Sequence, residues 1–265
     1  MERQNRDRAS PPPPLAAINL RKSLENQSGH PIEIIRSISF SLSQGEIVSI
    51  VGPSGCGKTT LLNVVCGLIP ASGGSVLWYG REQAGVPPRV GYMLQKDLLF
   101  PWRTALANAT LGLQVKGVKA REGRERAREL LQRLGLQPFE AFYPSALSGG
   151  MRQRVALART LAPDPEVLLF DEPFSALDFQ TKILIERDTV RLVRGAGRSL
   201  LLITHDVEEA VSMSDRVFVL SRRPCEIIAE HRIDLPVGRA DMIEARETPQ
   251  FAHYVRTIWT ELDIQ

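Results

Sequence analysis

Runs of apolar residues alternate with helical patterns through much of this chain. Ile47–Val51 is β-branched and apolar apart from one serine, and Val167–Phe170 and Leu200–Thr204 are mainly apolar runs of similar length. Runs of this kind are typical of strands buried on both faces. Helical spacing over residues 177–195 and 207–213 separates the later runs. Strands that alternate with helices predict right-handed crossovers and a parallel sheet.

Two regions depart from this alternation. Ile38–Leu42 alternates apolar and polar residues before a Gln44-Gly45 turn, which predicts a half-buried strand. Residues 97–162 lack strong strand patterns and contain two charged, periodic segments, so they predict a helical subdomain. Further short strands are expected at residues 76–79, 89–94, 217–220 and 227–233.

The two ends of the chain differ in character. Residues 1–14 are polar and end in four consecutive prolines, so a disordered tail is expected over residues 1–16. Residues 236–265 predict a helical segment packed on the domain. Its apolar residues have helical spacing along one face, and they are Phe251, Tyr254, Val255, Ile258, Trp259 and Leu262. The alternative, a helix on a membrane surface, lacks a basic opposite face.

The composition mainly excludes classes of partner and of site. In 265 residues, 43% hydrophobic and 24% charged residues are ordinary for a soluble globular protein, and a net charge of +3 is too small to predict a nucleic-acid partner. Cys56, Cys66 and Cys225 form no C-x-x-C pair, so neither a disulfide framework nor a zinc site is expected. The polar N-terminus predicts no secretory signal, and the longest uncharged stretch is broken by proline and glycines. Contact with a membrane is therefore expected only through a partner.

A complete G-x-x-x-x-G-K-[ST] phosphate loop follows the first buried strand and opens into a predicted helix at 60–68. Glycines allow backbone N–H groups to approach phosphate oxygens, and the helix N-terminus favours anions. Lys58 is expected at the β- and γ-phosphates, and the Thr59 hydroxyl is expected to bind Mg²⁺. A dinucleotide fingerprint is excluded because Thr60 stands where a glycine is needed. The predicted nucleotide-binding residues are Gly52, Pro53, Ser54, Gly55, Cys56, Gly57, Lys58, Thr59 and Thr60.

Two adjacent carboxylates end the strand at 167–170, on the usual ligand edge of a parallel sheet. Asp171 is expected to hold the Mg²⁺ shell, while Glu172 positions or deprotonates the attacking water. The alternative is an exposed acid pair at a strand end.

A second glycine turn lies between the phosphate loop and this acidic pair. Ser148 predicts an N-cap, and Gly149 and Gly150 begin a helix that ends before Pro163. The chain thus has a second helix N-terminus suited to anions but only one complete phosphate loop. We therefore expect this helix to cap the γ-phosphate of a nucleotide held by another copy.

These motifs, in this order, resemble the nucleotide-binding subunit of an ABC transporter over residues 17–235. The resemblance also covers Gln95 after a strand, Asp178 in Ser-Ala-Leu-Asp, and His205 in Thr-His-Asp. It implies that Gln95 contacts Mg²⁺ and the nucleophilic water while sensing the membrane partner. It also implies that His205 contacts the γ-phosphate and that Asp178 communicates across a dimer. Taken alone, a histidine at a strand end is more often structural.

The resemblance implies an α/β fold and a set of partners. The expected fold is a P-loop NTPase core with a mainly parallel sheet, an N-terminal antiparallel β subdomain and the inserted helical subdomain at 97–162. The implied cofactors are ATP and Mg²⁺. The implied assembly is a homodimer, or a pair with another ABC ATPase subunit, bound peripherally to a permease at the cytoplasmic face of the cell (inner) membrane.

The stretch Leu98–Thr104 resembles a segment of importers for nitrate, sulfonates and taurine. By that resemblance Phe100 and Trp102 receive the permease's coupling helix, and an extracytoplasmic solute-binding protein acts indirectly. The alternative is that both side chains fill the core of the helical subdomain. One position departs from the family pattern, because Leu24 stands where an aromatic residue usually stacks on adenine. Alternatively, the insertion at 25–31 shifts the alignment.

Two other classes of function compete with an importer ATPase. Soluble ABC ATPases that act on nucleic acid or ribosomes tend to carry long coiled-coil insertions or tandem cassettes, and this chain has neither. A GTPase or small-molecule kinase needs a guanine-reading N-K-x-D motif or an acceptor site. That motif is absent, and the second glycine turn would have no role.

Overall fold

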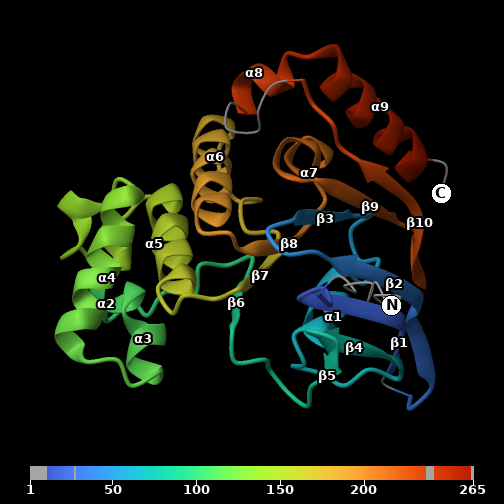
Figure 1. Cartoon of the computed structure of the whole chain (residues 1–265), viewed down its shortest axis with the longest axis horizontal. Coiled ribbons are helices and arrows are strands. Elements are labelled where there is room, and N and C mark those ends of the chain that lie inside the picture. Colours follow the sequence, from blue (N-terminus) through green and yellow to red (C-terminus); the bar gives the residue numbers. More distant parts are fainter. Residues whose placement is uncertain (1–10, 27, 237–241, 264–265) are drawn as a thin grey trace, which may run out of the picture.

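One mixed sheet of ten strands runs through the computed structural model, which describes residues 11–26, 28–236 and 242–263 (Figure 1). Its strand order is β5-β4-β1-β2-β10-β9-β3-β8-β7-β6. In chain order the strands are β1 (Leu15–Glu25), β2 (Pro31–Leu42), β3 (Ile47–Val51), β4 (Gly73–Trp78), β5 (Arg81–Glu82), β6 (Val90–Met93), β7 (Val167–Asp171), β8 (Ser199–Thr204), β9 (Arg216–Leu220) and β10 (Cys225–Arg232).

The parallel half of the sheet contains the apolar runs of the sequence. β9, β3, β8, β7 and β6 are all parallel to one another, and every residue of β3, β7 and β8 is buried. Alternate residues of β7 enter different cores: Leu168 and Phe170 pack with helices α5 and α6, whereas Leu169 packs on the side of α1. The strands of this half are hydrophobic along their length because helices cover both faces of the sheet.

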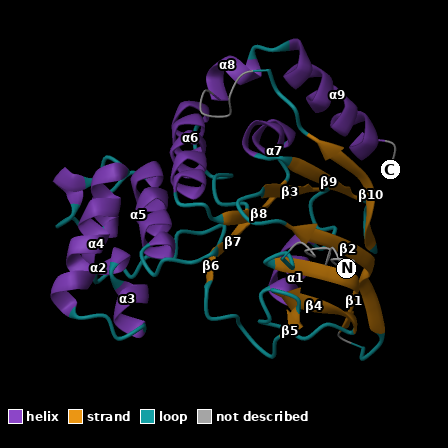
Figure 2. Ribbon diagram, viewed as in Figure 1, coloured by secondary structure: helices purple, strands orange, loops and turns teal. Residues whose placement is uncertain are grey.

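The other half of the sheet is antiparallel and forms the N-terminal subdomain (Figure 2). Strand β10 joins the two halves, because it is antiparallel to β9 and parallel to β2. Strand β1 begins at Leu15, inside the tail expected at residues 1–16. Leu15 is fully buried between Leu42 and Trp78, so burial outweighs the influence of the preceding prolines. Residues 1–10 of the expected tail lie outside the described residues.

The helices, in chain order, are α1 (Lys58–Val65), α2 (Ala105–Ala109), α3 (Leu111–Val115), α4 (Ala120–Arg133), α5 (Gly149–Leu161), α6 (Phe179–Gly195), α7 (Val207–Met213), α8 (Met242–Arg246) and α9 (Pro249–Asp263). Helices α2 to α5 form the separate helical lobe on the left of Figure 1, between β6 and β7. The predicted combination of a mainly parallel core, an antiparallel subdomain and an inserted helical subdomain is confirmed.

The C-terminal helices pack over α6 and α7. Phe251 and Ile258 of α9 are buried in a core shared with α7 and β9. Trp259 lies on the predicted apolar face of α9, but its side chain is 48% exposed and is therefore not buried in this core. No helix within the described ranges is long and apolar enough to cross a membrane. Residues 237–241 and 264–265 of the segment predicted at 236–265 are outside those ranges.

Candidate functional site

The predicted chemistry converges at the carboxyl ends of three neighbouring parallel strands. The phosphate loop follows β3, Asp171 is the last residue of β7 with Glu172 directly after it, and His205 follows β8. Adjacent parallel strands deliver their ends to one edge of the sheet. A polar cavity of about 310 Å³ opens there, lined by Ser54, Gly55, Gly57, Lys58, Thr59, Thr60, Gln95, Glu172 and Arg223.

The phosphate loop adopts a conformation that depends on glycine at one position in particular. Gly57 has φ +127°, and a Cβ there would lie 2.8 Å from Cγ2 of Ile34. Any other residue would be strained and would collide with β2. Cys56 points inward, is 2% exposed, and burial raises the pKa of its thiol. The thiol therefore points away from the cavity, and only the backbone of Cys56 is left to meet a phosphate there.

Lys58 lies folded onto its own loop. Its Nζ donates hydrogen bonds to the carbonyls of Gly52 and Pro53, both at 3.0 Å, and lies 3.5 Å from Oε1 of Glu172. The side chain is only 5% exposed. These contacts hold a buried ammonium at the wall of the cavity, with carbonyl and carboxylate oxygens as its partners.

Thr59 lines the cavity and is hydrogen-bonded to Asp171 behind it. Thr59 Oγ1 donates to Oδ1 of Asp171 at 3.2 Å. Burial raises the pKa of the Asp171 carboxyl, and the hydrogen bond from Thr59 opposes that shift. Hydroxyl, carboxylate and the nearby Gln95 amide are hard oxygen donors, the set that Mg²⁺ prefers together with substrate phosphates. These residues therefore fit Mg²⁺, although the described part of the chain contains no all-protein cluster of three or more His, Cys, Asp or Glu.

Glu172 connects the acidic strand to the loop after β8. Its Oε2 lies 2.8 Å from Nδ1 of His205, and its backbone N donates to the carbonyl of Ile203 at 2.8 Å. Its φ is +46°, an uncommon backbone conformation for a non-glycine residue. Such a conformation in a cavity is a pointer to function, since the surrounding fold must maintain it.

Gln95 reaches the same site from β6. Its Nε2 donates to Oγ of Ser175 at 3.3 Å, and that hydroxyl donates to the carbonyl of Glu172 at 3.0 Å. Its own backbone carbonyl accepts a hydrogen bond from Gln153 of α5 at 3.0 Å. Gln95 therefore connects the acidic strand physically to the helix that begins at the second glycine turn.

The second glycine turn does not join its own phosphate loop. Ser148 caps α5 by accepting from the N–H of Met151 at 3.3 Å, as predicted for an N-cap. Gly149 lines a different cavity, of about 470 Å³, with Gln95, Asp97 and Leu177. A Cβ on Gly150 would come within 2.4 Å of Thr181, so α5 needs glycine there to approach α6.

Asp178 also lies apart from the phosphate loop. Its Oδ1 accepts from the backbone N–H of Thr181 at 3.0 Å and caps α6. Hydrogen bonds from Thr181 lower the pKa of this carboxyl. Within one chain, Asp178 and the second glycine turn thus form an outer surface rather than part of the cavity around Lys58.

Several residues at the site have no counterpart in the sequence-based prediction. Arg223 lines the cavity and donates to the carbonyl of Gly55 at 2.8 Å. Arg222, Trp259 and Leu262 line an adjoining cavity with the phosphate loop, Glu172 and His205. The arginines directly follow β9, a strand parallel to β3, so their place at the ligand edge could have been found. The approach of α9 could not, because only tertiary packing brings it there.

The surface near Gln95 carries an exposed aromatic pair. The rings of Phe100 and Trp102 stack with centroids 5.1 Å apart and an interplanar angle of 8°. Trp102 is 71% exposed, so the alternative that it fills the core of the helical subdomain is wrong. Leu24, at the end of β1, faces Ile32 across the strand pair, and these side chains are 42% and 40% exposed.

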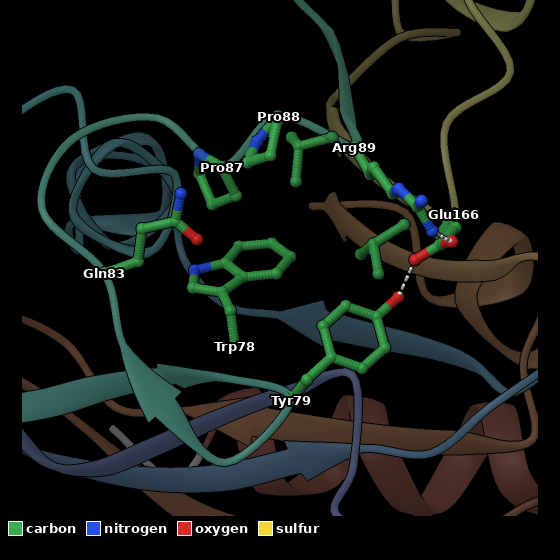
Figure 3. Close-up of a pocket in the computed structure, with 9 residues that line it drawn as sticks. Trp78, Tyr79, Gln83, Pro87, Pro88, Arg89 and Glu166 are labelled. Atoms are coloured by element: carbon green, nitrogen blue, oxygen red, sulfur yellow. Dashed lines mark hydrogen bonds and ion pairs between the residues drawn. The ribbon is translucent and has the colours of Figure 1, made fainter.

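A more apolar cavity exists elsewhere, at the edge of the antiparallel subdomain (Figure 3). It has a volume of about 390 Å³ and is lined mainly by Trp78, Tyr79, two prolines and the Arg89–Glu166 ion pair. No residue from the predicted site lines it. The cavity at Lys58 differs from this one because the charged side chains of the predicted site converge on it.

Comparison with known proteins agrees with this geometry. The model of a protein family described as ABC transporter matches residues 35–175. The chain is 47% identical to the uncharacterized ABC transporter ATP-binding protein YtlC of Bacillus subtilis, over 86% of this chain and 88% of that protein. It is 39% identical to the taurine import ATP-binding protein TauB of Jannaschia sp., over 90% of both chains. TauB of Rhizobium johnstonii is 41% identical over 84% of this chain and 87% of its own length.

Solved structures give the same result. A dimeric structure of MJ0796, described as a bacterial ABC transporter cassette, superposes with a TM-score of 0.75 at 30% identity, covering 83% of this chain and 99% of that one. A dimeric post-hydrolysis state of the same cassette, bound to ADP and Pi, superposes with a TM-score of 0.74 at 30% identity, with the same coverage.

Proposed function

We propose that this chain, which belongs to the ABC transporter ATP-binding family and is an ATPase of that family, energises uptake of a small anion. The solute is of the nitrate, sulfonate or taurine type. The observation that carries the proposal is the division of the motifs: Lys58 and Glu172 line one cavity and His205 lies 2.8 Å from Glu172, while Gly149 lines another cavity. Each chain then supplies two half-sites, and closure of two chains completes them.

The roles of the cavity residues follow from charge and position. Lys58 and the backbone N–H groups of the phosphate loop bind the β- and γ-phosphates. Glu172 orients the attacking water and accepts its proton, a role worth about 10²- to 10⁴-fold in rate. His205 holds the carboxylate of Glu172 in place at 2.8 Å and contacts the γ-phosphate. Gln95 lines the same cavity as Lys58 and Glu172.

Mg²⁺ would be held by Thr59, Asp171 and Gln95 together with phosphate oxygens. The ion supplies positive charge against the phosphates during transfer. Arg223 adds a further protein cation at the mouth of the cavity.

The second chain completes the site. Ser148, Gly149 and Gly150 of one subunit face the γ-phosphate held by its partner, and Asp178 lies in the same interface. The dimeric relatives of this fold support this arrangement. The partner is a second copy or a paired ABC ATPase subunit.

Adenine is proposed to rest on aliphatic side chains. Leu24 and Ile32 are cross-strand neighbours with exposed surfaces, and Ile34, two residues along β2, contacts Gly57 of the phosphate loop. Apolar contact here substitutes for aromatic stacking and is weaker, because a flat ring covers more of the base.

The proposed membrane contact is the stacked pair of Phe100 and Trp102. An exposed tryptophan beside an arginine (the guanidinium of Arg103 lies 5.8 Å from the Phe100 ring centroid) is a typical anchor for an amphipathic helix. We place the chain at the cytoplasmic face of the cell membrane, bound to a permease that receives solute from an extracytoplasmic binding protein. The taurine import relatives support the solute class.

The test is ATP hydrolysis by the permease complex. The complex is copurified, reconstituted, and assayed with binding protein preloaded with taurine, an alkanesulfonate, nitrate or, as a control, maltose. Stimulation by one of the first three solutes is expected, and by maltose none. Trp102→Ala should lose the permease during copurification, whereas Val115→Ala, at a residue 82% exposed in the same subdomain, should retain it. Stimulation by maltose alone, or full retention in Trp102→Ala, would count against the proposal.

A further inference from the structure

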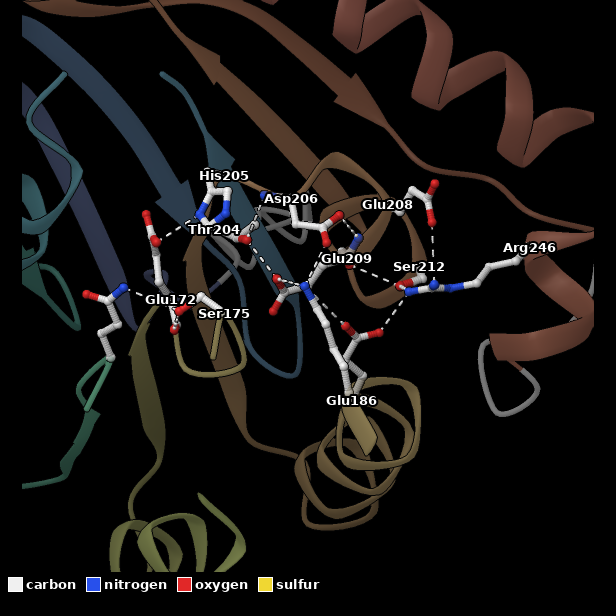
Figure 4. Close-up of polar contacts among 12 residues, drawn as sticks. Glu172, Ser175, Glu186, Thr204, His205, Asp206, Glu208, Glu209, Ser212 and Arg246 are labelled. Atoms are coloured by element: carbon white, nitrogen blue, oxygen red, sulfur yellow. Dashed lines mark hydrogen bonds and ion pairs between the residues drawn. The ribbon is translucent and has the colours of Figure 1, made fainter. Parts of the chain in front are cut away.

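A buried charge cluster lies directly behind the loop that carries His205 (Figure 4). It joins α6, α7 and α8 and does not line the cavity around Lys58. The members are Lys182, Glu186, Thr204, Asp206, Glu208, Glu209, Ser212 and Arg246. Its connection to the catalytic cavity is the short segment formed by Thr204, His205 and Asp206.

Both neighbours of His205 are tied to the cluster. Thr204 Oγ1 donates to Oε2 of Glu209 at 2.7 Å and accepts from the backbone N–H of Asp206 at 3.0 Å. Asp206 Oδ1 accepts from the backbone N–H of Glu209 at 3.1 Å and caps α7. The orientation of His205 toward Glu172 therefore depends on where Glu209 and Asp206 are held.

One lysine holds both of these carboxylates. Nζ of Lys182 lies 2.7 Å from Oδ2 of Asp206 and 3.1 Å from Oε2 of Glu209. It also lies 3.9 Å from Oε1 of Glu186, an oxygen with no hydrogen-bond partner among the described residues. A third carboxylate is thus within reach of the same ammonium but does not hydrogen-bond to it.

Arg246 binds that third carboxylate, Glu186, through its other oxygen. Its guanidinium donates to Oε2 of Glu186 at 2.9 Å and to Oγ of Ser212 at 3.3 Å, and it lies 3.5 Å from Oε2 of Glu208. Glu186 and Glu209 are 0% and 1% exposed, so water cannot replace a lost partner. Arg246 belongs to α8, beyond the residues that match the family model.

Removing Arg246 would leave three acidic groups around one cation. Burial already raises the pKa of Glu186 to about 8, and the two neighbouring cations oppose that shift. Burial also raises the pKa of Glu209. Without Arg246, Oε2 of Glu186 loses its hydrogen-bond donor, and Lys182, 3.9 Å from Oε1, is the cation left to turn toward it. That change weakens the contacts of Asp206 and Glu209 that hold the His205 loop.

We propose that Arg246 is a positioning residue for ATP hydrolysis. By occupying Glu186 it keeps Lys182 on Asp206 and Glu209, and so it holds His205 against Glu172. This inference rests on the roles given above to His205 and Glu172. On this proposal the C-terminal segment contributes to hydrolysis, because Arg246 holds the charged side chains that in turn hold the His205 loop.

The first measurement compares substitutions of two arginines in the full chain. Arg246→Met should lower kcat by about tenfold or more, because small displacements of catalytic groups are costly, while the KM for ATP stays within about twofold. Arg246→Lys should recover part of the loss. The matched control, Arg256→Met on an exposed face of α9, should retain normal kcat. Normal kcat in Arg246→Met would overturn the proposal.

The second measurement removes the carboxylate together with the cation. In Arg246→Met/Glu186→Gln, Lys182 again faces only Asp206 and Glu209, so kcat should return to within about threefold of the unmodified chain. This variant leaves no extra buried charge, and it carries the test if Arg246→Met does not fold. A folded double variant as slow as Arg246→Met would contradict the proposal, since packing alone would then explain the loss.

The third measurement separates this inference from the proposed role of His205. If His205→Ala leaves kcat unchanged, the catalytic assignment of His205 fails, and the inference fails with it. If His205→Ala lowers kcat, adding Arg246→Met should have little further effect, because Arg246 acts through His205. Independent, multiplicative losses would leave the site assignment intact and refute the positioning role alone.

Discussion

Glu172 stands between His205 and Lys58: its Oε2 lies 2.8 Å from Nδ1 of His205, and its Oε1 lies 3.5 Å from Nζ of Lys58. One carboxylate thus contacts both a proposed γ-phosphate ligand and a phosphate-binding cation. Lys58 is shared between this carboxylate and two loop carbonyls. In the proposed mechanism, a bound triphosphate draws Lys58 away from Glu172.

Glu172→Gln should therefore tighten ATP binding as well as stop hydrolysis. The neutral amide competes less for Lys58, and a buried ammonium that has lost its carboxylate partner favours phosphate oxygens, so the Kd should fall by about fivefold or more. Equilibrium dialysis with a non-hydrolysable ATP analogue measures the change in Kd. Glu140→Gln is the control, since it neutralises a carboxylate that pairs with Arg128 in the helical subdomain and leaves Lys58 paired with Glu172. Weaker binding by Glu172→Gln would contradict this account of Lys58.

Leu24→Tyr should strengthen nucleotide binding by restoring a ring beside the base. Replacing aliphatic contact with stacking is worth about 0.5–1.5 kcal/mol, or roughly two- to tenfold in Kd. A fluorescent ATP analogue titrated into both proteins measures it. Ile18→Tyr is a matched control, because Ile18 is 43% exposed on the same strand but lies farther from its end. Equal affinity for Leu24→Tyr and the unmodified chain would indicate that adenine lies elsewhere.

The sequence was most informative where the chemistry is local. The phosphate loop, the strand that ends in Asp171 and Glu172, and the cap at Ser148 depend on residues within a few positions of one another. Strand–helix alternation then places the ends of β3, β7 and β8 at one edge. The architecture was predictable for the same reason, because continuous apolar runs differ from alternating ones.

Long-range contacts were beyond prediction from a single sequence. Glu186 and Arg246 are 60 positions apart, and neither residue type in isolation distinguishes a buried partner from a solvated charge. The start of β1 at Leu15 was missed because the proline run dominated the local pattern. Trp259 was expected in the core, and only the path of α9 shows that it borders the phosphate loop instead.

The burial of Glu186 predicts an unusual dependence of stability on pH. Its pKa is raised from its ordinary 4.5 to about 8, so between these values the unfolded chain has released a proton that the folded chain still binds. Stability from this group is therefore greatest at low pH and falls as pH rises through that window, by an amount on the order of a few kcal/mol. The groups that face it are Lys182, Asp206, Glu208, Glu209 and Arg246.

Glu186→Gln should flatten this pH dependence. Because the amide does not titrate, the variant should gain stability relative to the unmodified chain as pH rises toward about 8, and the gain should vanish near pH 4.5. Thermal unfolding across that range, followed by circular dichroism, measures the difference. Glu208→Gln, at a half-exposed carboxylate beside the same arginine, should leave the pH profile nearly unchanged. Parallel profiles for Glu186→Gln and the unmodified chain would show that Glu186 is not the titrating group.

Two inactive variants should complement each other if the second glycine turn acts on the partner's nucleotide. Ser148→Arg blocks the turn but leaves the phosphate loop intact, whereas Lys58→Ala does the reverse. In a Glu172→Gln background, neither variant alone should form an ATP-dependent dimer. A mixture carrying different affinity tags should form a mixed dimer, because one composite site is complete in it. Tag-specific capture with and without ATP measures this, and Ser148→Ala serves as the small-residue control. ATP-dependent self-association of Ser148→Arg alone would place the turn outside the dimer interface, since neither composite site of that dimer would otherwise be complete.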